Sequence, residues 1–376
     1  MKTSPPLQQN QSERVYARQI AFAAAFLLPA AQFLESPSIL AKHAMGDLLL
    51  PALIHFLLQS LVLLSIVYAA SKSSVCLFDR LKGFFGKTMP ILYAFFALFY
   101  LFFGVLPLLD MEKYAYAAFY DTAPTAFSFG TFFLFSAYVC TKGIKSIGRS
   151  ADLCLFLFLF PFLALLAMSL TKADFSSLMP LFGTDFSRIG NAFSHTIPHF
   201  SNVVLLLPLI ARLQYKEGDC VKIMSGYWTG AALSLLFLAV FYAVFSSIAP
   251  REHYAFSKIA QYFPALSVIG RFDLIFIYLL SVVLLFYTCL PLQYTTECIA
   301  NLFKMERKTW ISAVLHLLLF IGVLFLNKYY NSIYRFISGN LFWIFILIAD
   351  MVPPFLIFLP KTSPSSKHSK KEHSYA

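Results

Sequence analysis

Two long apolar segments of the chain are interrupted by proline and by polar side chains. The first interruption reads Pro29-Ala30-Ala31-Gln32 and is followed by Glu35. A proline inside a helix removes a backbone hydrogen-bond donor and leaves one carbonyl without its usual partner. We therefore expect this helix to break and to turn backbone polar groups toward a ligand. A simple proline kink, with Glu35 in the outer headgroup region, is the alternative interpretation.

The second interruption combines histidines, a proline and small polar residues, namely His195, Pro198, His199, Ser201 and Asn202. Ser201 or Asn202 could cap the N-terminus of a second half-helix near the centre of a membrane. Backbone amides at such an N-terminus attract an anion, for example a carboxylate. The alternative for the two histidines is an interfacial position near the outer surface.

Ionisable side chains also fall deep inside apolar segments, where they are costly and usually functional. Asp350 and His316 lie at comparable distances from the same end of their segments, so they could pair and carry a proton. A structural hydrogen bond that ties two helices together is the alternative. Glu35 is a third candidate for ion coupling. Glu297 is expected to snorkel or to pair with Lys304.

The elements that must position these residues are long and apolar. The chain has 376 residues, of which 59% are hydrophobic and 12% charged, as in a polytopic helical membrane protein. At roughly 20 apolar residues per crossing, the predicted spans are 18–40, 48–70, 88–110, 124–141, 151–170, 192–213, 224–248, 267–300, 309–326 and 338–359. Residues 254–263 could form a short interfacial helix between the seventh and eighth spans.

The two interruptions fall in the first and sixth spans, and this spacing is informative. Two interrupted helices at matching positions of two halves mark the substrate site of inverted-repeat transporters. Because five is odd, two halves of five spans enter the membrane in opposite directions. The sequence therefore predicts an all-α polytopic membrane protein with ten transmembrane helices, arranged as a 5+5 inverted repeat with helices 1 and 6 interrupted.

The basic residues alternate between the two sides of the predicted membrane. With the N-terminus inside, 20 of the 29 Lys and Arg residues lie on the inner side, which predicts that both termini are cytoplasmic. We expect a disordered leader over 1–16, one domain over 17–360 and a basic disordered tail over 361–376 that contacts anionic lipid. Within the domain, the first repeat is placed at about 17–170 and the second at about 190–360.

Composition and motifs exclude several classes of function. The net charge of +11 is scattered over loops rather than gathered on one face, which argues against nucleic-acid binding. The six cysteines form no CxxC pair, so we expect neither a disulfide framework nor a metal site. The chain also lacks a phosphate-binding glycine loop and a nucleophile elbow. We expect no enzyme activity and no cofactor.

Several short motifs resemble those of a known family, the B subunits of spore germinant receptors. These endospore germination permeases belong to the amino acid–polyamine–organocation superfamily. The matching motifs are Ala17-Arg18-Gln19-Ile20, Pro37-Ser-Ile-Leu-Ala41, Lys142-Gly-Ile-Lys145, Ile147-Gly-Arg149-Ser-Ala-Asp152, Leu207-Pro208 and Gly270-Arg271-Phe272-Asp273. The resemblance extends over nearly the whole chain.

The resemblance implies a pocket between spans one, three, six and eight that recognises a small nutrient, commonly an amino acid. It also implies a location in the inner membrane of a dormant spore, with an A subunit and a C-subunit lipoprotein as partners. One departure concerns the first interruption, where this superfamily usually has glycine and this chain has none between Pro29 and Gln32. The identity of the ligand therefore cannot be transferred.

Together these features predict a germinant-sensing receptor subunit. The carboxylate of an amino acid would face amides near Ala30–Gln32 and Ser201–Asn202, and aromatic residues would select its side chain. The predicted ligand-binding residues are Pro29, Ala30, Ala31, Gln32, Tyr100, Phe103, His199, Ser201, Asn202 and Tyr287. The first alternative is a proton-coupled amino-acid permease that uses Asp350 and His316. A channel for ions or small metabolites is a further alternative.

Overall fold

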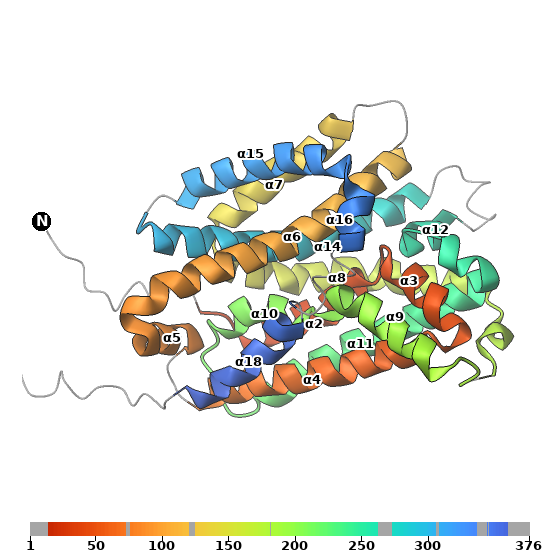
Figure 1. The fold of residues 1–376 in the computed structure, drawn as a ribbon, viewed down its shortest axis with the longest axis horizontal. Coiled ribbons are helices and arrows are strands. Elements are labelled where there is room, and N and C mark those ends of the chain that lie inside the picture. The colour runs from red at the N-terminus through yellow and green to blue at the C-terminus, as the bar shows by residue number, and fades with distance from the viewer. Residues whose placement is uncertain are drawn as a thin grey trace, which may run out of the picture.

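The computed structural model is a bundle of long helices (Figure 1). It describes residues 14–72, 76–119, 125–180, 182–261, 273–305, 308–336, 344 and 346–359. Most of the predicted leader and the whole predicted tail lie outside these residues. The end of the leader is described, however, and Val15 there is buried and bridged to Leu213. Residues 14–16 are therefore structured, and the disorder predicted for the rest of the leader stays a prediction.

The α-helices follow the apolar segments of the sequence closely. They are α2 (Ala17–Ala31), α3 (Ser36–Ala44), α4 (Leu49–Ser71), α5 (Leu77–Phe85), α6 (Met89–Phe119), α7 (Thr125–Thr141), α8 (Ile144–Ser169), α9 (Phe186–Phe200), α10 (Val203–Ile210), α11 (Asp219–Phe245), α12 (Ala255–Gln261), α14 (Asp273–Leu302), α15 (Lys308–Asn327), α16 (Tyr330–Phe336) and α18 (Val352–Phe355).

Shorter helical turns complete the order of elements. They are the 3-10 turns η1 (Met45–Asp47), η2 (Gly86–Thr88), η4 (Phe175–Leu178), η5 (Ser246–Arg251) and η8 (Leu356–Phe358), and the π-helical segment η7 (Ile346–Met351). A short helix, α12, is present where one was predicted after the seventh span, and its interfacial position stays a prediction.

Within the residues that the structure describes, seven helices are long and apolar enough to cross a membrane, and the bent pair α2 and α3 makes an eighth candidate. Two shorter apolar helices, Gly130–Thr141 and Ile346–Phe358, lie within the predicted fourth and tenth spans. The chain is therefore an all-helical, multi-pass membrane protein. The count of ten spans and the division into two repeats of five stay predictions.

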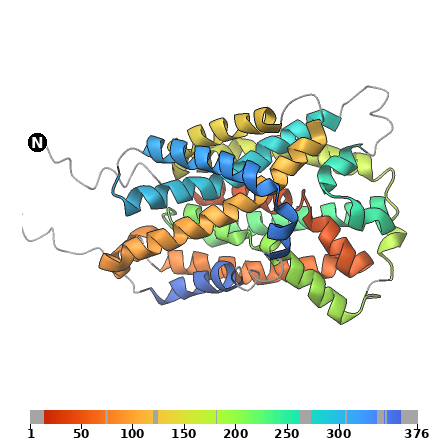
Figure 2. The ribbon, with the colours of Figure 1, turned by 45° about the horizontal axis from the view of Figure 1, so that its top comes forward.

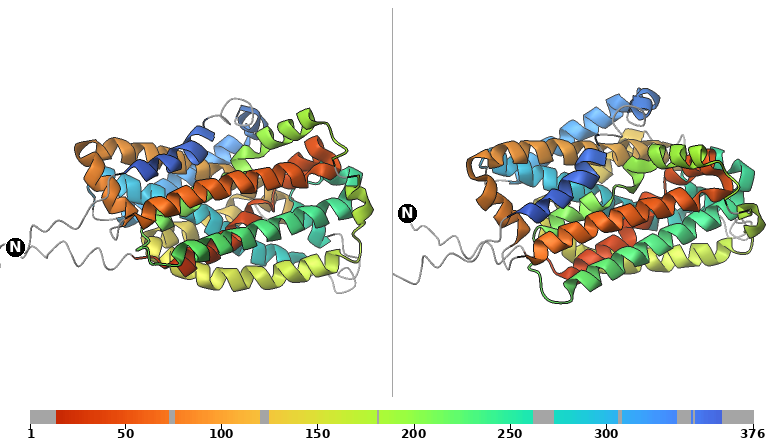
Figure 3. Two further views of the ribbon diagram at one scale, coloured as in Figure 1. Left: turned by 90° about the horizontal axis from the view of Figure 1, so that it is seen from below. Right: turned by 60° about the horizontal axis from the view of Figure 1, so that its bottom comes forward.

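Helix α2 occupies the middle of the bundle, and 12 of its 15 residues are buried. It packs against α8, α10, α11 and α14. Helix α4 lies beside α11, and α18 lies against α4 (Figure 3). On another side of the bundle α15 packs against α7 and α6 (Figure 2). A helix that is apolar all round, like α2, requires such complete enclosure.

Two glycines explain how closely α11 approaches α2. A Cβ atom added at Gly226 would lie 2.3 Å from the carbonyl oxygen of Ala21. One added at Gly230 would lie 2.6 Å from the carbonyl oxygen of Ala24. The spacing is that of the small-xxx-small motif, which lets two membrane helices pack backbone to backbone. The motif is visible in the sequence and was not part of our prediction.

Buried arginines close one end of the bundle. Arg80 on α5 is 2% exposed and donates to two backbone carbonyl oxygens. One belongs to Ala69 in the last turn of α4 (2.6 Å), and the other belongs to Leu359, directly after η8 (2.9 Å). Arg212 forms an ion pair with Glu297 of α14, and both side chains are largely buried. The prediction that Glu297 snorkels or pairs with Lys304 is wrong, because its partner comes from the end of the sixth predicted span.

Candidate ligand-binding site

The predicted break in the first span is confirmed, and it begins at Gln32, three residues after the proline. Pro29 lies inside α2, which ends at Ala31, and α3 leaves at an angle of 59°. The amide of Gln32 donates to the carbonyl oxygen of Pro29 (2.9 Å), and that of Phe33 to Ala30 (3.2 Å). These bonds close the end of α2.

Helix α12 supplies hydrogen-bond donors to the same break. The amide of Ala255 donates to the carbonyl oxygen of Leu34, and the amide of Phe256 donates to that of Phe33, each at 3.2 Å. Carbonyls freed by a break need new partners inside a membrane. The end of α12 therefore stabilises the bend by backbone contacts.

The predicted break in the sixth span is present as a two-residue interruption between α9 and α10, which together form one candidate span over Phe186–Ile210. Its two residues, Ser201 and Asn202, are buried. The prediction that one of them caps α10 with its side chain is wrong. The Ser201 hydroxyl donates back to Ile197 (2.9 Å), and the Asn202 side-chain amide donates to the carbonyl oxygen of His199 (2.8 Å).

The backbone amides at the second break are engaged within the protein. The Ser201 amide donates to Ile197 (3.0 Å), and the Asn202 amide to Phe200 (2.7 Å). The Val203 amide donates to the side-chain oxygen of Gln59 on α4 (3.4 Å). The donors predicted at Ser201 and Asn202 are therefore already bonded within the protein.

A cavity lies between the two breaks. Its free volume is about 60 Å³, room for roughly four to six water molecules at about 10–15 Å³ each. It is bounded by α2, the start of the first break, α6, α9, α14 and α16. The lining residues are Ala30, Ala31, Leu34, Phe103, Leu106, Pro107, Leu109, Asp110, Pro198, His199, Leu284, Tyr287, Tyr330 and Ile333.

Half of the predicted ligand-binding residues line this cavity, namely Ala30, Ala31, Phe103, His199 and Tyr287. The others lie behind the lining, and they are Pro29, Gln32, Tyr100, Ser201 and Asn202. The Tyr100 hydroxyl donates to the carbonyl oxygen of Val204 (2.8 Å), which fixes α6 to α10. The Tyr287 hydroxyl donates to the side-chain oxygen of Asn202 (2.8 Å). Asn202 therefore touches the site through a residue that lines it.

Sequence reasoning missed two polar residues of the lining, Asp110 and Tyr330. The Tyr330 hydroxyl donates to Asp110 at 2.6 Å, and both residues are buried. Asp110 is the last residue of the predicted third span and is not among the predicted site residues. A carboxylate at the end of an otherwise uncharged span was the available signal.

A family model for spore germination proteins matches residues 15–331. The chain belongs to the spore germination protein family. No curated protein matches its sequence. The family match agrees with the resemblance that the short motifs suggest.

Solved structures share the fold of this spore germination protein. MhsT in complex with L-phenylalanine is 16% identical, covers 93% of this chain and 88% of its own, and has a TM-score of 0.60. A histidine-to-alanine mutant of the manganese transporter of Eremococcus coleocola is 13% identical and has a TM-score of 0.58. The match covers 97% of this chain and 84% of the transporter chain. The germination protein therefore has the fold of membrane transporters.

The candidates for ion coupling in this spore germination protein do not meet. Asp350 on η7 accepts a hydrogen bond from the side-chain amide of Gln59. His316 on α15 contacts Ser136 of α7 (2.9 Å) and the carbonyl oxygen of Ser312 (2.8 Å). The predicted pairing of His316 with Asp350 is wrong, because each is bonded to a different neighbour.

Glu35, the third coupling candidate, is buried at the break of the germination protein and lies 4.0 Å from the ring of His253. It does not line the cavity. Among the residues that the structure describes, no group of three or more His, Cys, Asp or Glu side chains is placed to hold a metal ion.

Proposed function

We propose that the protein is the membrane subunit of a spore germinant receptor and that it binds an amino acid in the cavity between the two breaks. The observation that supports this most is the position of the cavity. It touches the broken first span, α6, the broken sixth span and α14, and a buried carboxylate lies in its wall. Binding would favour one of two arrangements of the bundle, and this bias would pass to the partner subunits.

The polar groups of the lining favour a ligand with a positively charged end. Asp110 accepts hydrogen bonds, and an ammonium group is a strong donor. His199 and Tyr287 lie in the same lining and offer partners for the other end of an amino acid. We infer that the ammonium group, rather than the carboxylate, is the end held by charge.

The size of the cavity supports a small ligand. Room for roughly four to six waters corresponds to the non-hydrogen atoms of the smallest amino acids. A ligand with a large aliphatic or aromatic side chain would require the bundle to open.

We also infer how this receptor subunit is arranged in its membrane. It has ten spans in two inverted repeats, of which the first begins with α2 and α3 and the second begins with α9 and α10. The excess of basic residues on one side supports cytoplasmic termini. Membership of the germination family supports the inner membrane of a spore, A- and C-type receptor subunits as partners, and a role without enzyme activity.

The test uses the purified protein in sealed liposomes. Labelled L-amino acids are screened for saturable binding and for accumulation, with and without a proton gradient. Saturable binding without accumulation supports the receptor function. Accumulation driven by the gradient contradicts it and supports a transporter, whereas no saturable binding of any amino acid contradicts both.

Filling the cavity should abolish binding. Ala31→Leu adds three carbon atoms to the wall of a cavity of about 60 Å³, so we expect the affinity for the amino acid to fall at least about tenfold. Ala232→Leu, on an exposed face of α11, is the matched control and should bind normally. Equal affinities in the two variants would place the ligand elsewhere. Circular dichroism of both variants checks that the bundle is intact.

A proton-coupled permease is the second candidate, and the contacts of Gln59 favour it. This side chain donates to Asp350 and accepts from the amide of Val203 at the second break. Protonation of Asp350 would therefore act on the bond that holds the start of α10. A coupled change in the broken helix is the kind of step that alternating access requires.

If the protein transports, Asp350→Asn should remove the dependence of flux on the proton gradient. His316→Gln is the control, because the hydrogen bonds of His316 join α15 to α7 rather than to either break. Flux is measured in liposomes at two values of external pH. A gradient-dependent flux that survives in Asp350→Asn would exclude this carboxylate as the coupling group.

A further inference from the structure

A second cavity, of about 600 Å³, lies beside the start of α2. One wall is formed by residues 14–18 and the other by residues 213–222, which lead into α11. The backbone bridge between Val15 and Leu213 joins the two walls, and the Val15 amide donates to the carbonyl oxygen of Arg212 (3.4 Å). The cavity is therefore built by two segments whose spacing is fixed.

The cavity is strongly basic. Its cationic residues are Arg14, Arg18, Lys216 and Lys222, and Asp219 is its one carboxylate, so the lining carries a net charge of +3. This concentration differs from the scattered distribution of basic residues over the other loops. An excess of cations around a cavity favours an anionic ligand.

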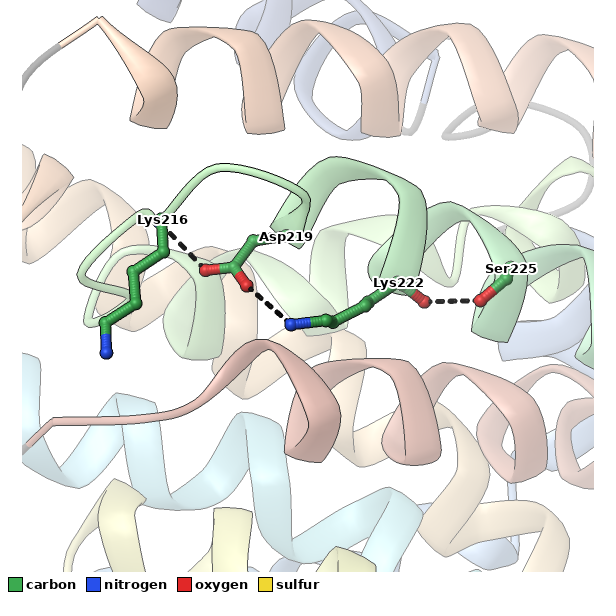
Figure 4. A network of polar contacts seen from close by, with 4 residues as sticks. All are labelled: Lys216, Asp219, Lys222 and Ser225. Atoms are coloured by element: carbon green, nitrogen blue, oxygen red, sulfur yellow. Dashed lines mark hydrogen bonds and ion pairs between the residues drawn. The ribbon is translucent and has the colours of Figure 1, made fainter.

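The carboxylate of Asp219 is committed to local structure (Figure 4). It accepts from the backbone amide of Lys216 (2.9 Å) and lies 3.5 Å from the ammonium nitrogen of Lys222. The ammonium group of Lys216 points away from Asp219 in the same view. Arg18 pairs with the partly exposed Asp152 at 3.0 Å. Within the cavity, Asp219 therefore neutralises mainly the charge of Lys222. Arg14 and Lys216 line the same cavity and remain as its cations.

Exposed apolar and aromatic side chains surround this basic cavity. Tyr16 is 64% exposed beside it, and α11 presents Val221 (72%) and Trp228 (38%) on its outer face. Helix α11 lies at the surface of the bundle (Figure 3). Tyrosine and tryptophan concentrate where a membrane meets water. These exposed aromatic side chains favour a position of the cavity near the boundary between acyl chains and headgroups.

We propose that this cavity binds the phosphate of an anionic phospholipid headgroup. Arg14 and Lys216 would donate to the phosphate oxygens, since guanidinium and ammonium groups form charge-assisted hydrogen bonds with phosphate. The acyl chains would run along the outer face of α11 past Val221 and Trp228. In the proposed orientation this is a lipid of the cytoplasmic leaflet, where basic pockets between helices bind such headgroups. The site is separate from the nutrient cavity.

The test measures lipid binding by the full chain in detergent micelles. Phosphatidylglycerol, phosphatidylcholine and inorganic phosphate are titrated separately, and bound lipid is counted by native mass spectrometry while the thermal midpoint is recorded. We expect saturable binding of phosphatidylglycerol with a higher midpoint, and weaker effects of the other two. The double variant Arg14→Gln, Lys216→Gln should bind phosphatidylglycerol roughly 30-fold more weakly.

The matched control is Lys142→Gln, Arg149→Gln, which removes the same charge from two exposed residues around the start of α8, another basic segment on the predicted inner side. Equal losses in both double variants would overturn the proposal, because net charge alone would then explain binding. Equal binding of phosphatidylcholine would overturn the selectivity for anions. Stabilisation by inorganic phosphate at the same concentration would replace the lipid with a free phosphate and overturn the lipid assignment.

Folding of the variants is checked by their elution as single monodisperse species. If the double variant fails this check, Lys216→Gln alone tests the proposal, because Lys216 is exposed. Its affinity should fall roughly fivefold, and an unchanged affinity would overturn the site. Amino-acid binding by the same samples is read separately, so failure at this cavity does not count against the nutrient cavity.

Discussion

Gly226→Ala is expected to destabilise the whole bundle, although alanine is the better helix former. The added Cβ would lie 2.3 Å from the carbonyl oxygen and 2.6 Å from the Cα of Ala21. All three of its nearest neighbours are backbone atoms of the central helix, so no side chain can move aside. Overpacking of this kind costs about 1–3 kcal/mol or more, which exceeds the gain of about 1 kcal/mol from helix propensity.

The measurement for this variant is the thermal midpoint of the purified protein, together with the fraction that elutes as a monodisperse species. Gly322→Ala on α15 is the matched control, because nothing lies within 4 Å of its added Cβ. The control should be neutral or stabilised by up to about 1 kcal/mol. If both variants unfold like the original protein, α11 and α2 are not packed as closely as described.

Glu297→Gln should have the second large effect, because it leaves Arg212 charged and largely buried. The Arg212 side chain is 15% exposed, and its guanidinium also lies 4.8 Å from the ring centre of Phe78. Breaking a buried ion pair by removing one partner costs about 3–5 kcal/mol. We expect a lower thermal midpoint and an opening of this end of the bundle.

Cys298 reports on that opening, since it follows Glu297 and is 1% exposed. Its labelling by a thiol reagent, located by mass spectrometry, should rise strongly in Glu297→Gln. Glu252→Gln is the control, because its pair with Lys258 is partly exposed and is expected to contribute at most about 1 kcal/mol. Unchanged protection of Cys298 in Glu297→Gln would show that this pair does not close the bundle.

Replacing both members of the pair by methionine gives an independent check. A buried ion pair exchanged for apolar side chains of similar volume is often neutral in stability. The double variant should therefore recover most of the stability that Glu297→Gln loses. A double variant as unstable as the single one would mean that the charges act through other contacts.

The sequence predicts those parts of the fold that depend on neighbouring residues. Long apolar runs predict the helices, because about 20 residues are enough to cross a membrane. The two breaks are equally local, since Pro29 followed by Gln32 and Pro198 followed by Ser201 carry their own signal. Some of the residues predicted at these breaks, such as Ala30, Ala31 and His199, line the cavity.

Contacts between distant segments could not be predicted from one sequence. The partner of Glu297 is 85 residues away, and that of Asp110 is 220 residues away. The amide of Val203 at the second break donates to Gln59 of another helix, 144 residues away. Each of these pairings is decided by which faces of helices meet, and periodicity within a single helix does not determine that.

The hydrogen bonds from α12 to the first break have a consequence for biosynthesis. The chain between Leu34 and Ala255 is about 220 residues long. A ribosome releases the first span well before it has made α12. The nascent first span must therefore enter the membrane without these donors, and its final bend can be fixed only once α12, in the second half of the chain, has been translated. Truncated chains that end before α12 would accordingly lack the finished cavity between the two breaks.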